Sequence, residues 1–152
     1  MSSPAHRIRE ARERLGLWPG VVADAAGLNH NWYFDVEHFD HEVTGNITLD
    51  QLIIIARTLG LTPLAVLEGP EFPPPLRRVS LEALAKQAEG RMLEQGLSVA
   101  DFSQRVGWEI APVFADPQHV RTYTVDALQQ ICREAGVDWR EALPSELNVA
   151  AG

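Results

Sequence analysis

The chain has 152 residues, 45% of them hydrophobic and 22% charged, and this composition excludes a disordered or collagen-like protein. Thirteen basic and twenty-one acidic residues give a net charge of −8, which repels polyanions such as nucleic acids at long range. Residues 1–14 lack the pattern of a signal peptide, and the longest apolar stretch, residues 52–56, is far shorter than the ~20 residues of a membrane span. Because Cys132 is the only cysteine, no internal disulfide can form, and we expect a cytoplasmic protein without a membrane segment.

The first half of the sequence predicts five short helices, each marked by a capping or stop residue. Ser3 followed by Pro4 is an N-cap with proline at the first helical position. Gly27 is typical of a tight turn between two helices, and Thr48 with Gln51 three residues later predicts a capping box. The helices are expected over residues 4–15, 19–26, 30–39 and 49–59 and from residue 63, with an extended loop over 40–46.

The second half repeats this pattern, which indicates an internal duplication. Near the start of each half, Gly16-Leu17, Val22-Ala23 and Gly27 reappear as Gly96-Leu97, Phe102-Ser103 and Gly107, at an offset of 80. Further on, Thr48-Leu49-Asp50-x-Leu52 reappears as Thr124-Val125-Asp126-x-Leu128, at an offset of 76. The second copy has therefore lost four residues between the two blocks.

The boundary between the copies lies at three consecutive prolines, residues 73–75, which cannot continue a helix and favour an extended conformation. The third helix of the second copy, over residues 110–116, is expected to keep only one or two turns because it contains Pro112 and precedes Pro117. The expected N-caps of its other helices are Ser80, Ser98, Thr124 and Asp138. The predicted organisation is a first domain over 1–68, a linker over 69–79, a second domain over 80–146 and a tail over 147–152.

Over residues 8–67 the first copy resembles the Xre-type, lambda-repressor/Cro-like helix-turn-helix family. The matching residues are Gly16-Leu17, Val22-Ala23, Gly27-Leu28, Asn29, Tyr33, Val36, Glu37 and Leu59-Gly60-Leu61. The second copy keeps Gly96-Leu97-Ser98, Gly107 and the last two helices, but not the third helix, which is the recognition helix of the family. The resemblance implies an all-α fold of tandem lambda-repressor-like five-helix domains, the second with a shortened recognition helix.

In this family the third helix enters the major groove of DNA and contacts base edges. On the outward side of that helix, a side chain such as Asn31 could hydrogen-bond adenine. The resemblance thus implies a DNA- or partner-contacting surface made by His30, Asn31, Trp32, Phe34, Asp35 and His38.

The chemistry of this surface is unusual for a protein that binds phosphate. Trp18-Pro19 stands where the family often has Ser-Gln, and no lysine or arginine lies between Ala26 and Arg57. Four carboxylates lie in and after the third helix, on Asp35, Glu37, Asp40 and Glu42. We expect the arginines of the first helix to pair with Glu10 and Glu13 on a solvated face, namely Arg7, Arg9, Arg12 and Arg14.

Several of these residues have two interpretations. Trp32 and Phe34 are large aromatics typical of a protein interface, but they could also pack on the 40–46 loop or against the other copy. A metal site at His30, His38 and His41 is conceivable, although a polar loop that contains histidines is favoured. Cys132 takes the place of Ala56 in the repeat, which predicts a small buried position.

No nucleophile with a base, carboxylate pair or phosphate-binding glycine loop is recognisable, so we expect no enzyme, no cofactor and no metal. The resemblance implies a helix-turn-helix regulatory protein, nominally a DNA-binding transcriptional regulator. The alternative is a protein-interaction module, such as an antiactivator, an antitoxin-like partner or an adaptor, that has the fold but does not bind DNA. The tandem copies could replace the usual dimer, or the second copy could make the chain a homodimer.

Overall fold

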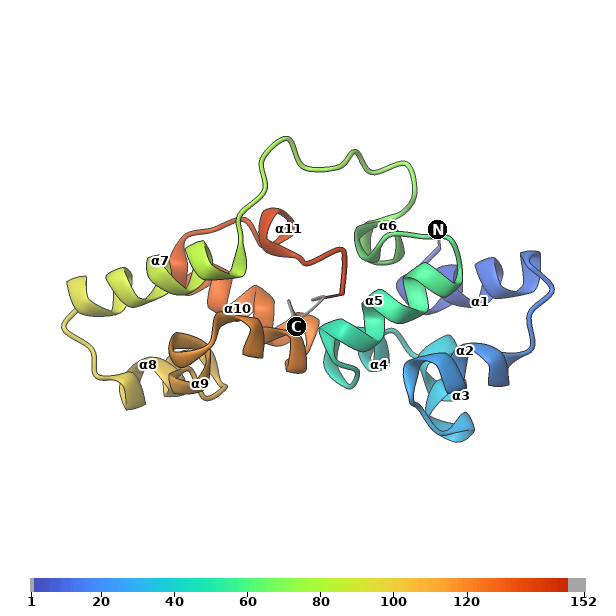
Figure 1. Ribbon diagram of the computed structural model, residues 1–152, viewed down its shortest axis with the longest axis horizontal. Helices are drawn as coiled ribbons and strands as arrows, with labels where there is room; N and C mark the ends of the chain where they lie inside the picture. The colour runs from blue at the N-terminus through green and yellow to red at the C-terminus, as the bar shows by residue number, and fades with distance from the viewer. Residues whose placement is uncertain (1, 148–152) are drawn as a thin grey trace, which may run out of the picture.

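A computed structural model describes residues 2–147, and the chain forms helices and no strand in that range (Figure 1). The all-α expectation is confirmed, and the predicted tail lies outside the described residues except for Leu147. The first helix group comprises α1 (Pro4–Arg14), α2 (Pro19–Ala26), α3 (His30–His38), α4 (Asp40–Gly45), α5 (Leu49–Thr58) and α6 (Pro63–Glu68). The second helix group comprises α7 (Leu81–Glu94), α8 (Val99–Val106), α9 (Ala111–Ala115), the 3₁₀ helix η1 (Pro117–Thr122), α10 (Val125–Ala135) and α11 (Trp139–Ala142).

The capping residues begin and end the helices as expected. Ser3 Oγ accepts a hydrogen bond from the His6 N–H, and Thr48 and Gln51 form the reciprocal capping box of α5. Gly27 ends α2 with a left-handed φ of 69°, a conformation that favours glycine. The caps expected in the second half are also formed, by Ser80, Ser98, Thr124 and Asp138.

The expected extended loop over residues 40–46 is wrong, because the chain forms the helix α4 there. The β-region backbone of Phe39 ends α3 and redirects the chain. Hydrogen bonds hold α4 at both ends, and its Val43 side chain is buried in between. At the start, the Asp40 carboxylate accepts from the Ala5 N–H at 3.0 Å, and at the end the Asn46 N–H donates to the Glu42 carbonyl oxygen. The first helix group therefore has six helices instead of the five expected.

The third helix of the second group is short, as expected. In α9, Pro112 takes a position in the first turn, where its missing N–H is tolerated. The chain then begins a further element, η1, in which Pro117 stands in the first turn and Asp116 accepts a hydrogen bond from the Gln118 N–H. The prolines thus shorten the helix but start a second one, which is not among the helices expected from the sequence.

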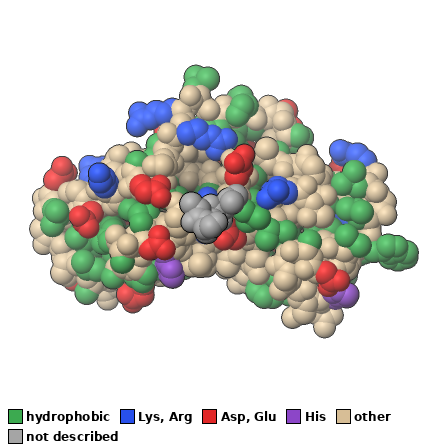
Figure 2. All heavy atoms as spheres, in the orientation of Figure 1, with side chains coloured by type: hydrophobic (Ala, Val, Ile, Leu, Met, Phe, Trp, Pro, Cys, Tyr) green, Lys and Arg blue, Asp and Glu red, His purple; other side chains and the backbone are tan. Residues whose placement is uncertain are grey.

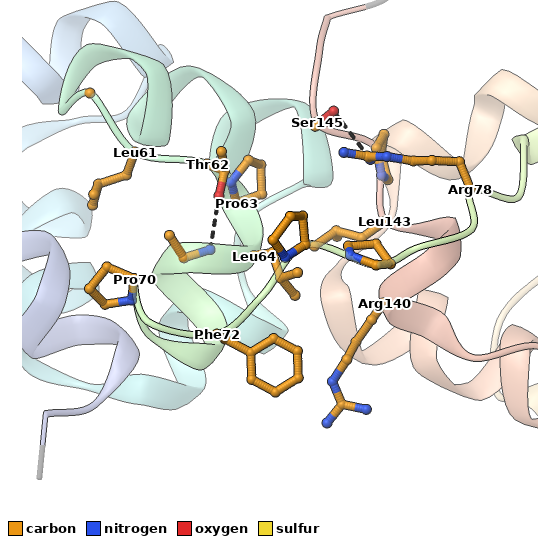
Figure 3. A pocket seen from close by; sticks show the side chains of 15 residues that line it. Leu61, Thr62, Pro63, Leu64, Pro70, Phe72, Arg78, Arg140, Leu143 and Ser145 are labelled. Atoms are coloured by element: carbon orange, nitrogen blue, oxygen red, sulfur yellow. Dashed lines mark hydrogen bonds between the residues drawn. The ribbon is translucent and has the colours of Figure 1, made fainter.

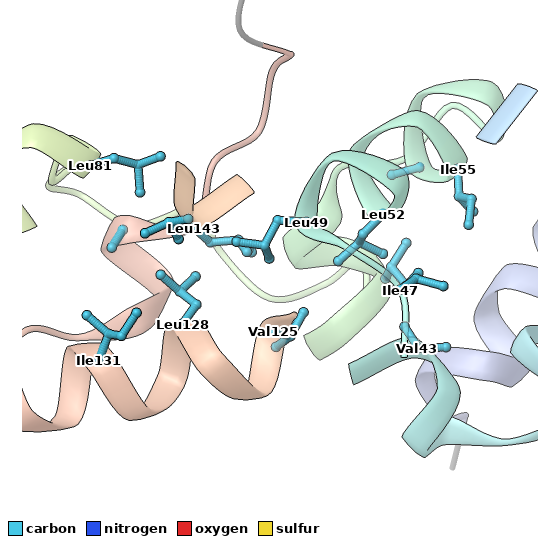
Figure 4. Packing of buried hydrophobic residues seen from close by; sticks show 14 of the residues in the cluster. Val43, Ile47, Leu49, Leu52, Ile55, Leu81, Val125, Leu128, Ile131 and Leu143 are labelled. Carbon is cyan, nitrogen blue, oxygen red and sulfur yellow. The ribbon is translucent and has the colours of Figure 1, made fainter. Parts of the chain in front are cut away.

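The two helix groups share one continuous hydrophobic core and pack directly on each other. Figure 4 shows Leu49 of α5 reaching toward α10, near Val125. The Leu49 N–H donates to the Tyr123 carbonyl oxygen at 2.8 Å, and Arg121 pairs with Asp50 at 3.3 Å. The prolines of the linker therefore do not hold the groups apart.

Figure 1 shows the consequence of this packing for the shape of the molecule. The pair α2–α3 and the pair α8–α9 lie toward opposite ends of the same long edge, and the linker arches over the other edge. No helix among residues 2–147 is long and apolar enough to span a membrane.

Candidate interaction surface

The outward surface of α2 and α3 is defined by the faces that the two helices bury. Val22, Ala23 and Ala26 of α2 and Tyr33 and Val36 of α3 lie in the core. The six candidate residues divide into two sets as a result. His30, Asn31, Phe34 and His38 are exposed, whereas Trp32 and Asp35 are half-buried.

The two aromatic candidates differ in their surroundings. Trp32 packs against the hydrophobic core of the protein, so it offers only part of its ring to a partner. Phe34 is 58% exposed, and its ring stacks on the imidazole of His38 with centroids 4.0 Å apart. The His38 Nδ1 also donates to the Phe34 carbonyl oxygen at 2.7 Å, which holds the imidazole against one face of the Phe34 ring.

The three histidines considered as metal ligands take part in separate interactions. His30 Nε2 lies 3.3 Å from the Asp24 carboxylate, His38 stacks on Phe34, and His41 lies 3.5 Å from Glu42. Among residues 2–147, no three histidine, cysteine or carboxylate side chains are placed to hold one metal ion. The three histidines thus make separate contacts and do not form one site.

Two charged residues of this region form a buried ion pair, which corrects the expectation for both. Arg12 donates to the Glu37 carboxylate at 2.6 and 3.0 Å, and Glu37 is only 4% exposed. The hydrogen bond to Glu37 raises the pKa of Arg12. Burial, together with the neighbouring Glu37, raises the pKa of Tyr33 as well. Glu37 is therefore not a surface carboxylate, and Arg12 does not lie on a solvated face.

Of the other arginines of α1, only Arg14 pairs as expected, with Glu10 at 2.8 Å. Arg9 contacts the His6 imidazole at 3.2 Å. The Arg7 guanidinium donates to the carbonyl oxygens of Val66 and Leu67 at 2.7 Å each, and so ties α1 to the end of α6. Arg7 and Arg12 are thus held by the fold and are not available to a ligand.

Exposed apolar side chains before and within α2 belong to this surface but are not among the six predicted contact residues. Leu15 and Val21 are about half exposed, and Trp18 is 77% exposed. The sequence signal is Trp18-Pro19 itself, because its departure from the Ser-Gln of the family removes a capping hydroxyl and a DNA-contacting amide and places a tryptophan at the start of α2. Figure 2 shows hydrophobic side chains projecting at the end of the molecule where α1 meets α2.

The electrostatics of this surface disfavour a polyanion. From residue 15 to residue 56 the chain contains no lysine or arginine, while Asp24, Asp35 and Glu42 add negative charge. In the face seen in Figure 2, no lysine or arginine appears along the lower edge, where both helix pairs lie. The Arg105 guanidinium of α8 lies 3.9 Å from the Glu134 carboxylate, which partly neutralises it. The second helix group therefore adds little positive charge to this edge of the molecule.

Comparison with known proteins identifies no family for this chain: no family model matches it, and no curated protein is significantly similar to it in sequence. The α2–α3 surface combines exposed apolar groups, a Phe34–His38 stack and carboxylates, and residues 15–56, which include both helices, contain no lysine or arginine. The arrangement offers binding chemistry and shows no pairing of a nucleophile with a base.

Proposed function

We propose that this chain is a helix-turn-helix-like regulatory protein that acts by binding another protein through α2, α3 and the turn before α2. The observation that carries the proposal is the exposure of Trp18 and Phe34 on a stretch of 42 residues, 15–56, without one lysine or arginine. Exposed aromatics of this size contribute most of the binding energy in protein interfaces. A DNA-binding surface needs the opposite composition, because phosphate contacts supply its sequence-independent affinity.

The charges indicate the chemistry of the partner. Asp24 and Asp35 flank the apolar groups with negative charge, and residues 15–56 contain no lysine or arginine to offset it. A complementary partner presents apolar side chains flanked by lysine or arginine. The basic surface of a DNA-binding protein has this composition, which is the chemistry that an antiactivator or an antitoxin-like protein covers.

A photo-crosslinking experiment tests the proposal. Benzoylphenylalanine in place of Phe34 should form a protein adduct in the producing cells, and the crosslinked peptide should contain lysine or arginine. The same group in place of Leu93, which is 67% exposed in the second helix group, is the matched control and should not give that adduct. An adduct that contains nucleic acid at position 34 would contradict the proposal.

The variant Trp18→Ser sharpens the experiment. Ser98 caps α8 at the equivalent position of the second group, so the serine should preserve or improve the start of α2. We expect Trp18→Ser to weaken the complex with the captured partner at least ~30-fold, the loss of an interface hot spot, with an unchanged circular dichroism spectrum. An unchanged affinity would show that Trp18 does not contact the partner.

DNA binding is the second candidate function, and one observation favours it. The pairs α2–α3 and α8–α9 lie along the same edge, as two half-site readers of a dimer would (Figure 1). If this candidate is correct, the purified protein shifts a specific duplex more strongly at 50 than at 200 mM salt, and Asn31→Ala abolishes the shift. The same result would refute the protein-binding proposal.

A further inference from the structure

A pocket of about 370 Å³ lies between the two helix groups, away from the α2–α3 surface. The first group contributes residues at the start of α6, such as Leu61 and Leu64, and the second contributes Leu143 after α11. The linker covers it with Phe72 and with prolines, and Figure 3 shows the Phe72 ring near Leu64. Its volume lies in the usual range for pockets that bind small molecules.

The charged residues that line this pocket are all of one sign. Its fifteen lining residues include Arg78 and Arg140 and no aspartate or glutamate, in a chain whose net charge is −8. Figure 3 shows Arg78 at one end, with its guanidinium beside Ser145, and Arg140 at the other end, near the Phe72 ring. The pocket is thus apolar in its middle and cationic at its ends.

The two arginines differ in how much of their charge is already neutralised. Arg140 pairs with Glu68 at 3.0 Å and with Asp138 at 3.6 Å, and its guanidinium lies 5.4 Å from the Phe72 ring centroid. Arg78 donates only to the Ser145 hydroxyl, at 3.4 Å, and forms no ion pair with a carboxylate of residues 2–147. The positive charge available to a ligand is therefore that of Arg78.

From this geometry we propose that the pocket binds a small organic anion with an apolar body, such as a medium-chain or aromatic carboxylate. The body lies against Leu61, Leu64 and Leu143, and the carboxylate accepts hydrogen bonds from Arg78. A ligand there touches the first helix group, the linker and the second helix group together. It stabilises their packed arrangement, because any molecule that binds only the packed form favours that form. The protein would thereby respond to the concentration of such an acid.

Calorimetric titration of the full chain with chosen probes tests this site. The probes are decanoate and 1-naphthoate, each compared with its uncharged analogue, decan-1-ol or 1-naphthamide, and decanoate also with decylammonium. We expect at least one of the two anions to bind, about tenfold more tightly than its uncharged analogue, the effect of a charge-assisted hydrogen bond. We expect decylammonium to bind most weakly of the three ten-carbon probes. In leucine-methyl NMR spectra, the signals of Leu61, Leu64 and Leu143 should shift.

Two arginine variants give a matched comparison. Arg78→Gln should weaken the binding of the anion about tenfold and leave that of its uncharged analogue unchanged. Arg77→Gln removes the adjacent exposed charge, which does not line the pocket, and should leave both affinities close to those of the wild type. Both positions are exposed, so neither change should disturb folding. Failure of both anions to bind, equal binding of an anion and its uncharged analogue, or equal effects of the two variants would each overturn the proposal.

Discussion

The two helix groups begin their helices with the same kinds of cap but fill their centres differently. In the first group, Arg12 of α1 and Glu37 of α3 form a buried ion pair. In the second group, Met92 of α7 stands at the position of Arg12, at the offset of 80, and is buried among apolar side chains. A helical scaffold of this kind can therefore be built around either a charged or an apolar centre. The charged version depends on both partners being present.

The largest expected effect comes from breaking that ion pair. Arg12→Met copies the residue of the second group but leaves the Glu37 carboxylate buried without its cation. We expect a loss of about 3 kcal/mol in the free energy of unfolding, measured by urea denaturation. The double variant Arg12→Met, Glu37→Met should regain most of that loss, because an apolar pair often replaces a buried ion pair without cost.

The control for this pair is Arg14→Met, on the same helix. The side chains of Arg14 and its partner Glu10 are 69% and 51% exposed, so their ion pair is solvated. We expect Arg14→Met to change the free energy of unfolding by less than about 0.5 kcal/mol. If Arg12→Met and Arg14→Met lowered the free energy of unfolding equally, the buried ion pair would stabilise the first group no more than the solvated pair does.

A smaller effect is expected from the hydrogen bond that supports the short third helix of the second group. In the first group, Asn29 caps α3 by accepting a hydrogen bond from the Trp32 N–H at 2.7 Å. In the second group, α9 has no side-chain cap of its own, and Ser103 of α8 accepts instead from the buried Ile110 N–H at 2.9 Å. Ser103 stands at the position of Ala23, so the hydroxyl is a feature of the second group.

We therefore expect Ser103→Ala to lower the free energy of unfolding by about 1–2 kcal/mol, because it leaves a buried N–H without an acceptor. Gln104→Ala changes the exposed neighbour on the same helix and should have an effect within about 0.5 kcal/mol. Urea denaturation measures both, and protection of the Ile110 amide from hydrogen exchange reports the bond directly. If that amide stays equally protected in Ser103→Ala, the serine does not hold α9.

The parts of the fold that local signals determine were predicted well. Caps such as Ser3, Thr48 and Ser98 accept from N–H groups three residues later, so the sequence contains both partners close together. α4 was missed because its stability depends on Asp40 reaching the Ala5 N–H, 35 residues away in the chain. The packing of the two groups across Leu49 could not be predicted for the same reason.

The candidate surface was predicted only in part, and the errors share a cause. Helical periodicity identified Phe34 and His38 as exposed, because the buried Tyr33 and Val36 fix the orientation of α3. Sequence alone places Glu37 among the surface carboxylates, because its partner Arg12 lies 25 residues earlier, on a helix rich in apparent local pairs. The pocket under the linker depends on both helix groups, so no local pattern marks it.

The smallest effect concerns Cys132 of α10, whose position in the first group is taken by Ala56. Both residues are buried, which confirms the expectation for the cysteine. Burial raises the pKa of the Cys132 thiol to about 12, with a smaller contribution from Asp138. The native thiol should therefore stay protonated and resist alkylation at pH 8, and it should react once the protein is unfolded.

The raised pKa makes the effect of Cys132→Ala depend on pH. Near pH 7 the substitution should cost about 1 kcal/mol for the lost sulfur contacts and the small cavity. Above the unfolded thiol pKa of about 8.5, the unfolded chain loses this proton while the native chain keeps it, so the wild type is destabilised as pH rises toward 12. By pH 9.5 this difference amounts to about 1.4 kcal/mol, so Cys132→Ala should then be at least as stable as the wild type. Urea denaturation of both proteins at pH 7 and at pH 9.5 measures the change. If the free energies of unfolding of wild type and variant differ by the same amount at both pH values, the thiol ionises as readily in the native core as in the unfolded chain.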